Sequence, residues 1–341
     1  MGKPLIFTAL WLVLCGTETI GAAEIKTAAL PELFKPSMIA IDPPQEQIIV
    51  VDGTTILVYS SRDLRLKKRL GREGEGPREF KREISGLDIT ANANIVYSVG
   101  KLSYFNKDWT FRQERKKPTG RGIGIVKPLA DRFVGYGLGR ENKQTFYTIC
   151  IYDREFNRIK EIHRRQSAYQ RGRGVRIFNE AYQFAVCGSM VLVAWGTELT
   201  VDAFDSRGTR LFSIRKEYRR VKVTDTHKRQ ALNYYRTNPL TKSQYEWYKH
   251  NLVFPHYLPA IRSILTADSR LYILTYKEEN NQDEFLVFDL KGRFLRSLLL
   301  PLHRTDTLNI PPFTIAGSKL YQLIENEDTE EWQLHLTPIP L

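Results

Sequence analysis

The sequence predicts an all-β fold, a six-bladed β-propeller with a helical insertion between the fourth and fifth blades. One segment recurs along the 341 residues: an apolar strand that ends in an aromatic residue, then a polar turn, then an alternating strand. The recurrences are 46, 47, 52, 84 and 48 residues apart, and all but one of these spacings match the period of a four-stranded propeller blade. A second apolar strand precedes most of the recurrences. Two β-sandwiches would not explain six similar segments in register.

The recurring segments place the outer part of each blade, in chain order. They read LVYSSRDLRLKKRL, SYFNKDWTFRQER, CIYDREFNRIKEI, DAFDSRGTRLFSI and LVFDLKGRFLRSL, with QLHLTPIPL as a truncated sixth, and their anchors are Tyr59, Phe105, Tyr152, Phe204, Phe288 and Leu336. The strands before them read QIIVVD, NIVYSV, RFVGYG, MVLVAW, RLYILTY and KLYQLI. These strands are apolar or alternate over five to seven positions, which is typical of strands that pack on both faces.

The sixth blade needs a strand from elsewhere in the chain. The sequence ends at Leu341, before an outer strand can follow WQLHLTPIPL. An open strand edge invites aggregation, so the ring has to be closed. We expect the segment from Ile25 to Leu33 to supply the missing strand.

The first 23 residues have the pattern of a signal peptide. Lys3 precedes an apolar run from Leu5 to Cys15, and Gly21-Ala22-Ala23 follows as a small-residue cleavage site. The run is too short to span a bilayer, and no later run is as apolar. The sequence therefore predicts residues 1–23 as a signal peptide, residues 24–341 as one propeller domain without a transmembrane segment, and export to the periplasm or the exterior. Lipidation at Cys15 is the alternative, but Leu14 stands where a lipobox has a small residue.

Composition excludes several classes of protein. Hydrophobic residues make up 42% of the chain, so intrinsic disorder is not expected. Three cysteines and six histidines are too few for a disulfide scaffold or a His/Cys-rich metal protein, and we expect no cofactor. Cys150 and Cys187 would remain after processing, either as buried thiols or as a disulfide. The net charge of +13 favours an anionic partner, and export makes nucleic acid an unexpected one.

The one long spacing marks an insertion at about residues 221–258. Thr224 and Asp225 can cap a helix that runs through Arg236 and ends before Pro239. Thr241 with Gln244 forms a capping-box pattern that would open a second helix. On that helix Tyr245, Tyr248 and Leu252 share a face that must be buried, either against the fourth and fifth blades or at a recognition site. Tyr234, Tyr235 and Trp247 cannot all share that face. We expect a helical hairpin at one mouth of the propeller, with Tyr235, Trp247 and Arg262 at its border.

One motif carries a family resemblance. GREGEGPREF, from Gly71 to Phe80, resembles the glycine-rich signature between blades of NHL-type six-bladed propellers, and more closely the GEGPGEF form found in exported bacterial propellers. Arg78 stands where that form has glycine. The segment from His256 to Tyr276 is similar to the start of the fifth blade in the same proteins. The resemblance implies the fold; its members bind or act on different molecules, so it implies no single function.

Linear motifs of catalysis are absent. GREGEGP, GRGIG and GYGLG lack the spacing of nucleotide-binding loops, and we interpret them as turns, bulges or close strand approaches. Some propeller lyases and lactonases hold a metal at the central tunnel, which no linear motif would reveal. The candidates for such a site are Asp42, Asp52, Asp88, Asp268 and His256, although Asp42, Asp88 and Asp268 also fit simple turn caps.

Basic residues gather on the outer strand of a blade or on the connection after it, in four successive blades. They allow two interpretations. Lys and Arg can protect an exposed sheet edge, or Arg72, Arg121 and Arg173 can converge from the connections onto one face and bind an anion.

These patterns predict an exported, monomeric binding module that recognises a protein or an anionic cell-envelope ligand on one face. The alternative is a metal-dependent lyase or hydrolase with its site at the tunnel mouth; the sequence leaves open whether any activity exists. Candidate ligand-binding residues are Arg72, Arg121, Arg173, Tyr235, Trp247, His256 and Arg262.

Overall fold

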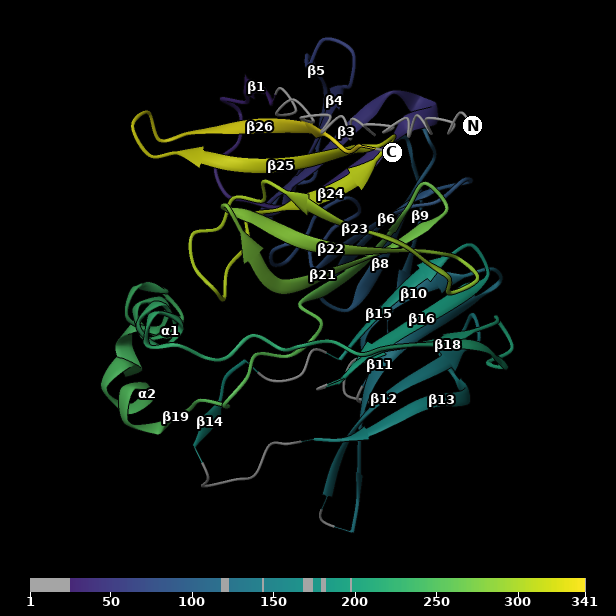
Figure 1. The fold of residues 1–341 in the computed structure, drawn as a ribbon. Coiled ribbons are helices and arrows are strands. Elements are labelled where there is room, and N and C mark those ends of the chain that lie inside the picture. The colour runs from purple at the N-terminus through teal and green to yellow at the C-terminus, as the bar shows by residue number, and fades with distance from the viewer. Residues whose placement is uncertain are drawn as a thin grey trace, which may run out of the picture.

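Six four-stranded antiparallel sheets follow one another in the computed structural model, which describes residues 25–117, 123–142, 144–167, 174–178, 182–196 and 198–340. The sheets are arranged as the blades of a propeller, with two helices set apart on one side (Figure 1). The predicted six-bladed β-propeller with a helical insertion between blades 4 and 5 is confirmed.

The first three blades use consecutive strands of the chain. Blade 1 has β2 (Pro36–Asp42), β3 (Gln47–Asp52), β4 (Thr55–Ser60) and β5 (Leu66–Leu70), with the short 3-10 helix η1 (Pro43–Gln45) after β2; blade 2 has β6 (Gly86–Ile89), β7 (Asn94–Ser98), β8 (Lys101–Phe105) and β9 (Phe111–Lys116); blade 3 has β10 (Ile123–Leu129), β11 (Arg132–Glu141), β12 (Gln144–Tyr152) and β13 (Arg158–Gln166).

The last three blades include one strand from the other end of the chain. Blade 4 has β15 (Gln183–Cys187), β16 (Met190–Trp195), β17 (Leu199–Phe204) and β18 (Arg210–Lys216); blade 5 has β20 (Ser263–Ala267), β21 (Arg270–Glu279), β22 (Gln282–Asp289) and β23 (Phe294–Leu300); blade 6 has β24 (Phe313–Ala316), β25 (Lys319–Asn326), β26 (Glu331–Pro338) and β1 (Lys26–Ala29).

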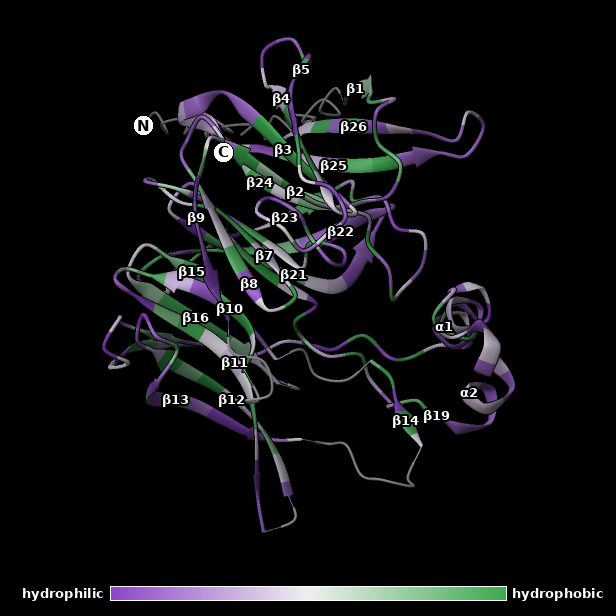
Figure 2. Ribbon diagram, turned by 180° about the vertical axis from the view of Figure 1, so that it is seen from behind, coloured by the Kyte–Doolittle hydropathy of each residue, from purple (hydrophilic) through white to green (hydrophobic). Residues whose placement is uncertain are grey.

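The second strand of a blade is buried on both faces, as its continuous apolar pattern predicts. In β3, Ile48 and Val50 pack toward blade 6, whereas Ile49 and Val51 pack toward blade 2. All four side chains have at most 1% of their surface exposed. Because successive strand residues point to opposite faces, a run such as IIVV lets one strand contribute to two blade junctions. Figure 2 shows the same apolar colour on several inner strands and hydrophilic colour on outer strands such as β9 and β13.

The core is divided among the junctions between blades. In the described part of the chain, one cluster of buried apolar side chains lies at each junction, including the one between blades 6 and 1. Each blade is therefore held by burial against both neighbours, and no blade has an independent core.

The N-terminal strand closes the ring, as predicted. Strand β1 pairs antiparallel with β26, from Lys26 opposite Leu336 to Ala29 opposite Gln333. Leu30 follows β1, its backbone N–H donates to the carbonyl of Trp332 at 2.8 Å, and its side chain is buried at the junction of blades 6 and 1. The first described residues thus complete the last blade and bridge it to the first.

The turn between the third and fourth strands has the same backbone conformation in blades 1–5. The residue two positions before the fourth strand has a left-handed conformation in every one of these blades, at Leu64, Trp109, Phe156, Gly208 and Gly292. In the first three of these blades the residue is large and its side chain packs into a blade junction. In blades 4 and 5 it is glycine, and a Cβ at Gly208 would lie 2.5 Å from Cγ2 of Ile162 in the preceding blade.

The glycine-rich segment 71–80 joins blade 1 to blade 2. Gly71 has φ +80°, and a Cβ there would lie 2.5 Å from the carbonyl oxygen of Thr54 and 2.7 Å from the Phe80 ring. The Phe80 side chain is fully buried at the junction of the two blades. Arg78, which replaces a glycine of the resembling motif, has φ +64°. The segment is therefore a tight structural joint, since glycine alone fits at position 71.

The two cysteines of the described chain are free thiols. Cys150 is buried at the junction of blades 2 and 3, whereas Cys187 is half-buried at the end of β15. The disulfide alternative is not formed in this structure.

The insertion folds into helix α1 (Asp225–Thr237), the 3-10 helix η2 (Lys242–Gln244), helix α2 (Tyr245–Asn251) and the two-residue strand β19 (Leu252–Val253). Thr224 caps α1 as predicted, because its hydroxyl accepts from the backbone N–H of His227. The predicted capping box of Thr241 and Gln244 is wrong: neither residue makes a side-chain capping bond. The Thr241 hydroxyl donates instead to the carbonyl of Tyr235 in the preceding helix at 2.9 Å, which ties the two helices together.

Candidate ligand-binding face

One face of the propeller carries the long connections. The fourth strand of each blade ends on the same side as the turn between the second and third strands, and the chain passes from there to the first strand of the next blade. We call this side the connection face. The segments 71–85, 174–178, 217–262 and 301–312 all lie in such connections, and in Figure 1 helices α1 and α2 project from this side.

Two connections combine into a small subdomain on this face. Strand β14 (Val175–Arg176), from the connection between blades 3 and 4, pairs in parallel with β19 of the insertion. An apolar cluster holds the unit together: Ile177, Phe178, Val223, Ala231 and Leu258 are buried in it, with Tyr276 and Leu308 of blade 5 and its following connection packed alongside. We call β14, residues 217–262 and this cluster the helical subdomain. It is attached to blade 5 by apolar contacts.

The predicted aromatic residues of the insertion differ in exposure. Tyr235 is half-buried and lies 4.5 Å from the Tyr248 ring, between the two helices. Trp247 is 52% exposed and touches Tyr248 edge-on. Tyr245 is half-buried, as are Tyr248 and Leu252, so the face that the sequence predicts to be buried is only partly covered. Trp247 is the large aromatic side chain that the helices leave accessible.

His256 and Arg262 lie on the segment that returns from the helices to blade 5. His256 is exposed, and its backbone carbonyl accepts from the N–H of Val223 at 3.0 Å. Arg262 does not border an open surface; only 9% of it is exposed. Its guanidinium lies over the Tyr276 ring at 5.3 Å and donates to the carbonyl of Thr307 at 2.9 Å.

A cluster of buried charges surrounds Arg262 at the base of the helical subdomain. Asp283 of β22 is 1% exposed and lies 4.0 Å from the Arg262 guanidinium and 3.2 Å from Arg304. Arg304 also pairs with Glu278 at the end of β21. Neither carboxylate oxygen of Asp283 accepts a hydrogen bond within the described residues. Burial raises the pKa of Asp283 to about 6, against the opposing effect of the two arginines.

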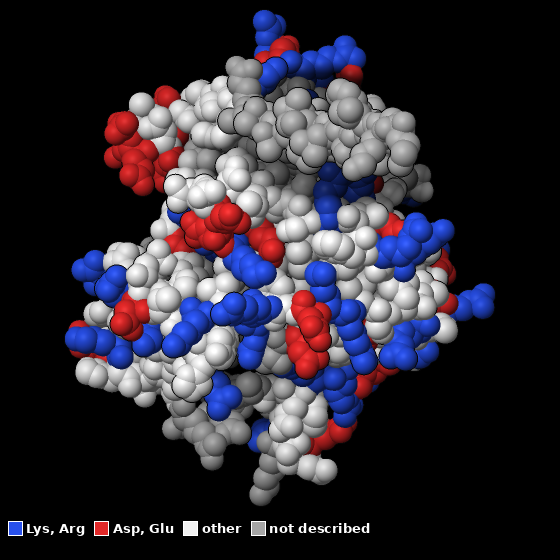
Figure 3. Space-filling view, in the orientation of Figure 1, with Lys and Arg blue, Asp and Glu red and all other residues white. Residues whose placement is uncertain are grey.

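The structure describes only one of the three arginines that the sequence predicts to converge from the connections, so their convergence stays a prediction. Arg72 is exposed, and its guanidinium pairs with Glu79 inside the glycine-rich joint at 2.6 Å. Arg121 and Arg173 lie outside the described residues. The basic clusters of blades 1–4 fall on or beside the outermost strands, as the sequence predicts. Figure 3 shows Lys and Arg side chains spread over the side that faces the viewer in Figure 1, with Asp and Glu between them.

The aspartates that the sequence offers as metal ligands at the central tunnel each bind a different partner. Asp42 is buried and pairs with Lys107, and Asp88 pairs with Lys127 at 2.8 Å. Asp52 accepts from two backbone N–H groups before β2, and Asp268 accepts from those of Gly317 and Ser318 in blade 6. Among the residues that the structure describes, no group of three or more His, Cys, Asp or Glu could hold a metal ion.

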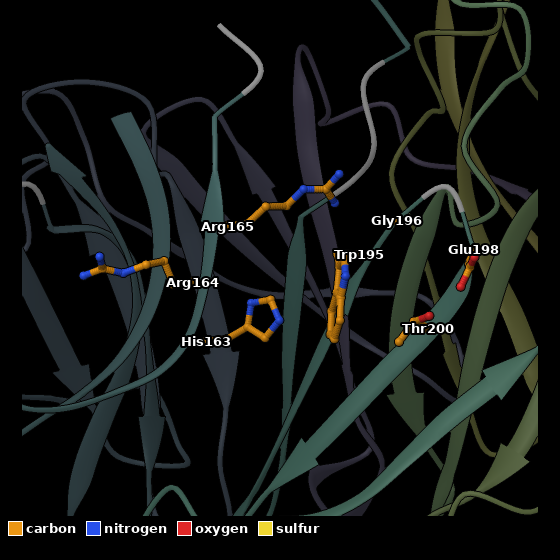
Figure 4. Close-up of a pocket in the computed structure, with 7 residues that line it drawn as sticks. All are labelled: His163, Arg164, Arg165, Trp195, Gly196, Glu198 and Thr200. Atoms are coloured by element: carbon orange, nitrogen blue, oxygen red, sulfur yellow. The ribbon is translucent and has the colours of Figure 1, made fainter. Parts of the chain in front are cut away.

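A pocket of about 400 Å³ opens between the outermost strand of blade 3 and the middle strands of blade 4 (Figure 4). Strand β13 supplies one wall; β16, β17 and the turn between them supply the other. Trp195 and Thr200 are paired residues of these two strands, so their side chains share the face of blade 4 that looks toward blade 3. The lining residues are His163, Arg164, Arg165, Trp195, Gly196, Glu198 and Thr200.

The aromatic wall of this pocket is held in place from behind. The rings of His163 and Trp195 pack with their centroids 4.1 Å apart, and Nδ1 of His163 is 2.8 Å from the hydroxyl of Tyr182. Burial lowers the pKa of His163 below its usual value, so its ring is neutral at pH 7. In Figure 4 the guanidinium of Arg165 lies beside the Trp195 indole, with Glu198 and Thr200 beyond the ring from His163. A ligand here would meet one aromatic face and several polar groups.

The sequence analysis missed this pocket. Its residues come from the end of one blade and the middle of the next, so no linear motif joins them. The only sequence signal is the aromatic residue at the end of the apolar run MVLVAW, where the strand leaves the core.

Comparisons with known proteins agree with the fold. No protein-family model matches the chain, and no curated protein is similar to it in sequence. Among solved structures, a protein from Bacteroides fragilis NCTC 9343 whose name describes it as exported is similar over 93% of this chain and 95% of its own, with a TM-score of 0.54 and 13% identity. At this identity the similarity shows the fold alone.

Two further solved structures are more distantly similar. The Pan2 WD40 domain of Neurospora crassa has a TM-score of 0.44 and 11% identity over 90% of each chain. The Cps50 (Swd1) β-propeller domain of Myceliophteria thermophila has a TM-score of 0.43 and 8% identity, over 92% of this chain and 98% of that one. In the described residues, no helix is long and apolar enough to cross a membrane.

Proposed function

We propose that this protein is an exported binding module in which residues 24–341 form one propeller domain and the connection face recognises a protein or an anionic envelope ligand. One observation carries the proposal: the helical subdomain combines an exposed tryptophan with a strong excess of positive charge. Segment 217–262 contains nine Lys and Arg against three Asp and Glu, an excess of six out of the net +13 of the whole chain. Such a surface attracts acidic partners and offers them an apolar anchor.

Exposed apolar side chains on the connection face also support its proposed role in binding. Leu240 is 87% exposed, and Trp247, Val253 and Tyr257 of the same segment are each more than 40% exposed. Phe34, Val99, Ile125 and Leu138 are exposed at connection-face ends of strands or turns in blades 1–3, whereas Ile159, Leu211, Phe294 and Leu295 are exposed at the opposite ends of outer strands. Large aromatic and aliphatic groups at an otherwise charged surface are the usual anchors of a protein interface.

The test uses two defined polyanions, poly-L-glutamate and polygalacturonate, as probes for an acidic protein and an anionic polysaccharide. Binding to either should weaken as salt rises, because each ion contact is screened. The double charge reversal Lys242→Glu with Lys249→Glu should weaken binding by about tenfold or more, since it removes four units of charge near the anchor. The matched control, Arg207→Glu with Lys291→Glu, changes two exposed turn residues on the opposite face and should leave binding within about twofold.

The apolar anchor is tested separately. Trp247→Ala should weaken binding of the probe that binds best, while the midpoint of thermal unfolding changes by only a few degrees because the side chain is half in solvent. If both charge-reversal pairs weaken affinity for the probes equally, binding depends on net charge alone and the connection face is not the binding surface. If neither probe binds at low salt, the proposal of an anionic ligand is wrong.

A further inference from the structure

The pocket between blades 3 and 4 is separate from the helical subdomain and has its own chemistry. It shares none of its lining residues with segment 217–262, so a ligand there would not depend on the proposed function of the subdomain. Its volume of about 400 Å³ lies near the lower end of the range for small-molecule sites, roughly 300–1,000 Å³. A single six-membered ring with its substituents fits such a space.

The aromatic wall favours a ligand ring with polarised C–H groups. The face of an indole is electronegative, so it attracts the electropositive edges of C–H bonds. Trp195 is supported by the His163 ring, which is in turn held by Tyr182, so the platform is fixed before a ligand arrives. A fixed platform loses less conformational entropy on binding than a mobile side chain.

The charges around the platform largely compensate one another. Arg164 lines the pocket, but in Figure 4 its side chain points away from Trp195, and its guanidinium is bound by Glu141 at 2.7 and 3.0 Å and by Glu161 at 2.6 Å. Glu198 adds a carboxylate to the lining, opposite the half-buried guanidinium of Arg165. Since cations and carboxylates are interspersed, a strongly anionic ligand would gain little net attraction here.

Hydroxyl groups match this mixture better than a charged group does. A hydroxyl both donates and accepts, so neighbouring hydroxyls of a ring can accept from the accessible part of the Arg165 guanidinium, whose Nη1 is buried, and donate to the carboxylate of Glu198. The hydroxyl of Thr200 adds a third polar group on the same wall. A pyranose offers both features at once: a face of C–H groups and a rim of hydroxyls.

We propose that the gap between blades 3 and 4 is a saccharide-binding subsite that takes one uncharged pyranose unit of an oligosaccharide, stacked on Trp195 and hydrogen-bonded by Arg165, Glu198 and Thr200. The subsite recognises the sugar without reacting with it. It adds a carbohydrate specificity to a propeller whose connection face carries a different binding surface.

The experiment measures binding of five neutral hexasaccharides, those of the cello, xylo, laminari, chito and malto series, by calorimetry and tryptophan fluorescence. At least one should bind with a Kd tighter than about 1 mM, and binding should change the fluorescence. Trp195→Ala should weaken that affinity at least tenfold and abolish the fluorescence change, while Trp195→Phe should retain much of the affinity. Glu198→Gln changes an exposed side chain and should weaken binding severalfold while the unfolding temperature stays the same.

Trp247→Ala is the matched control, because it removes an exposed tryptophan of the helical subdomain and should leave sugar affinity unchanged. Failure of all five sugars to bind overturns the proposal, and so does binding that survives Trp195→Ala in a folded variant. Preferential binding of hexagalacturonate, strengthened by Glu198→Gln, would overturn it in favour of an anion site. Because the polyanion tests use other residues, either proposal can fail while the other stands.

Discussion

Three large side chains that pack between blades belong to residues whose backbone has a left-handed conformation. Trp109, Phe156 and Leu64 occupy equivalent turns with positive φ, a conformation that costs a non-glycine residue roughly 1–2 kcal/mol. Trp109 is 2% exposed, and its indole N–H donates to Oε1 of Gln47 in the neighbouring blade at 2.9 Å. Burial of so large a side chain, about 3–5 kcal/mol by substitution to alanine elsewhere, outweighs the strain. The turn conformation therefore directs a side chain toward the preceding blade.

Arg78 has the same backbone strain without the burial. Its side chain is exposed, and its backbone N–H donates to Glu114 at 3.2 Å, a bond that any residue can make. We expect Arg78→Gly to stabilise the fold by up to about 1 kcal/mol, because glycine adopts φ +64° without a steric cost. Chemical denaturation of the two proteins measures the difference. Gly71→Ala in the same joint is the opposite control and should destabilise; a loss of stability in Arg78→Gly would show that the arginine side chain supports the joint.

Asp283 makes stability depend on pH. Its pKa is about 6 in the folded state, above the usual range of an aspartate, so the folded protein binds more protons than the unfolded chain between about pH 4 and 6. Stability from this group therefore falls as pH rises through that window. His227 of α1, whose pKa burial and Arg304 lower, acts in the opposite sense and favours folding above its ordinary pKa.

The substitution Asp283→Asn isolates the aspartate from these neighbours. We expect the variant to lose the decline in stability between pH 4 and 6 while the contribution of His227 remains. Thermal unfolding of both proteins from pH 4 to 8 measures the difference. Parallel curves for the two proteins would mean that Arg262 and Arg304 keep the carboxylate ionised throughout.

Among the elements, the N-terminal strand is the one that joins the last blade to the first. Strand β1 covers the outer edge of β26, and Leu30 and Leu33 after it are buried between blades 6 and 1. Without this segment, β26 would expose a row of unpaired backbone groups.

Removal of residues 25–33 should lower the unfolding temperature and promote concentration-dependent association, which light scattering and size-exclusion chromatography would detect. A synthetic peptide of residues 25–33 added in trans should partly restore the monomer. Lys26→Ala keeps the strand and is the control. A truncated protein that stays monomeric and equally stable would mean that blade 6 is complete with three strands.

The elements were largely predictable because each depends on a local pattern. The apolar runs gave the second strand of each blade, since a strand buried on both faces has to be apolar throughout. Helix α1 was predictable from Thr224 and Pro239, whereas the cap at Thr241 was not, because its hydroxyl bonds to Tyr235 in a different helix. Pairing of β14 with β19 joins residues far apart in sequence and left no local signal.

For the whole molecule, repetition predicted the ring but not the candidate sites on it. The period of the repeat fixes how many blades there are and on which face the connections lie. The charge cluster around Asp283 and the pocket beside Trp195 are made by blades and connections that repetition does not relate to one another. A search for sites in such a chain has to begin from the departures from the repeat and from aromatic residues at strand ends.

The pairing of β1 with β26 also dictates when the fold can be completed. Lys26 meets Leu336, so the contact that closes the ring joins segments separated by nearly the whole chain. A ribosome or an export channel delivers β1 long before its partner β26. Five blades can form while the chain is still emerging, but β1 has no partner until residues 331–338 appear. During that interval the nascent propeller is an open arc, and chaperones that bind extended segments would find β1 accessible.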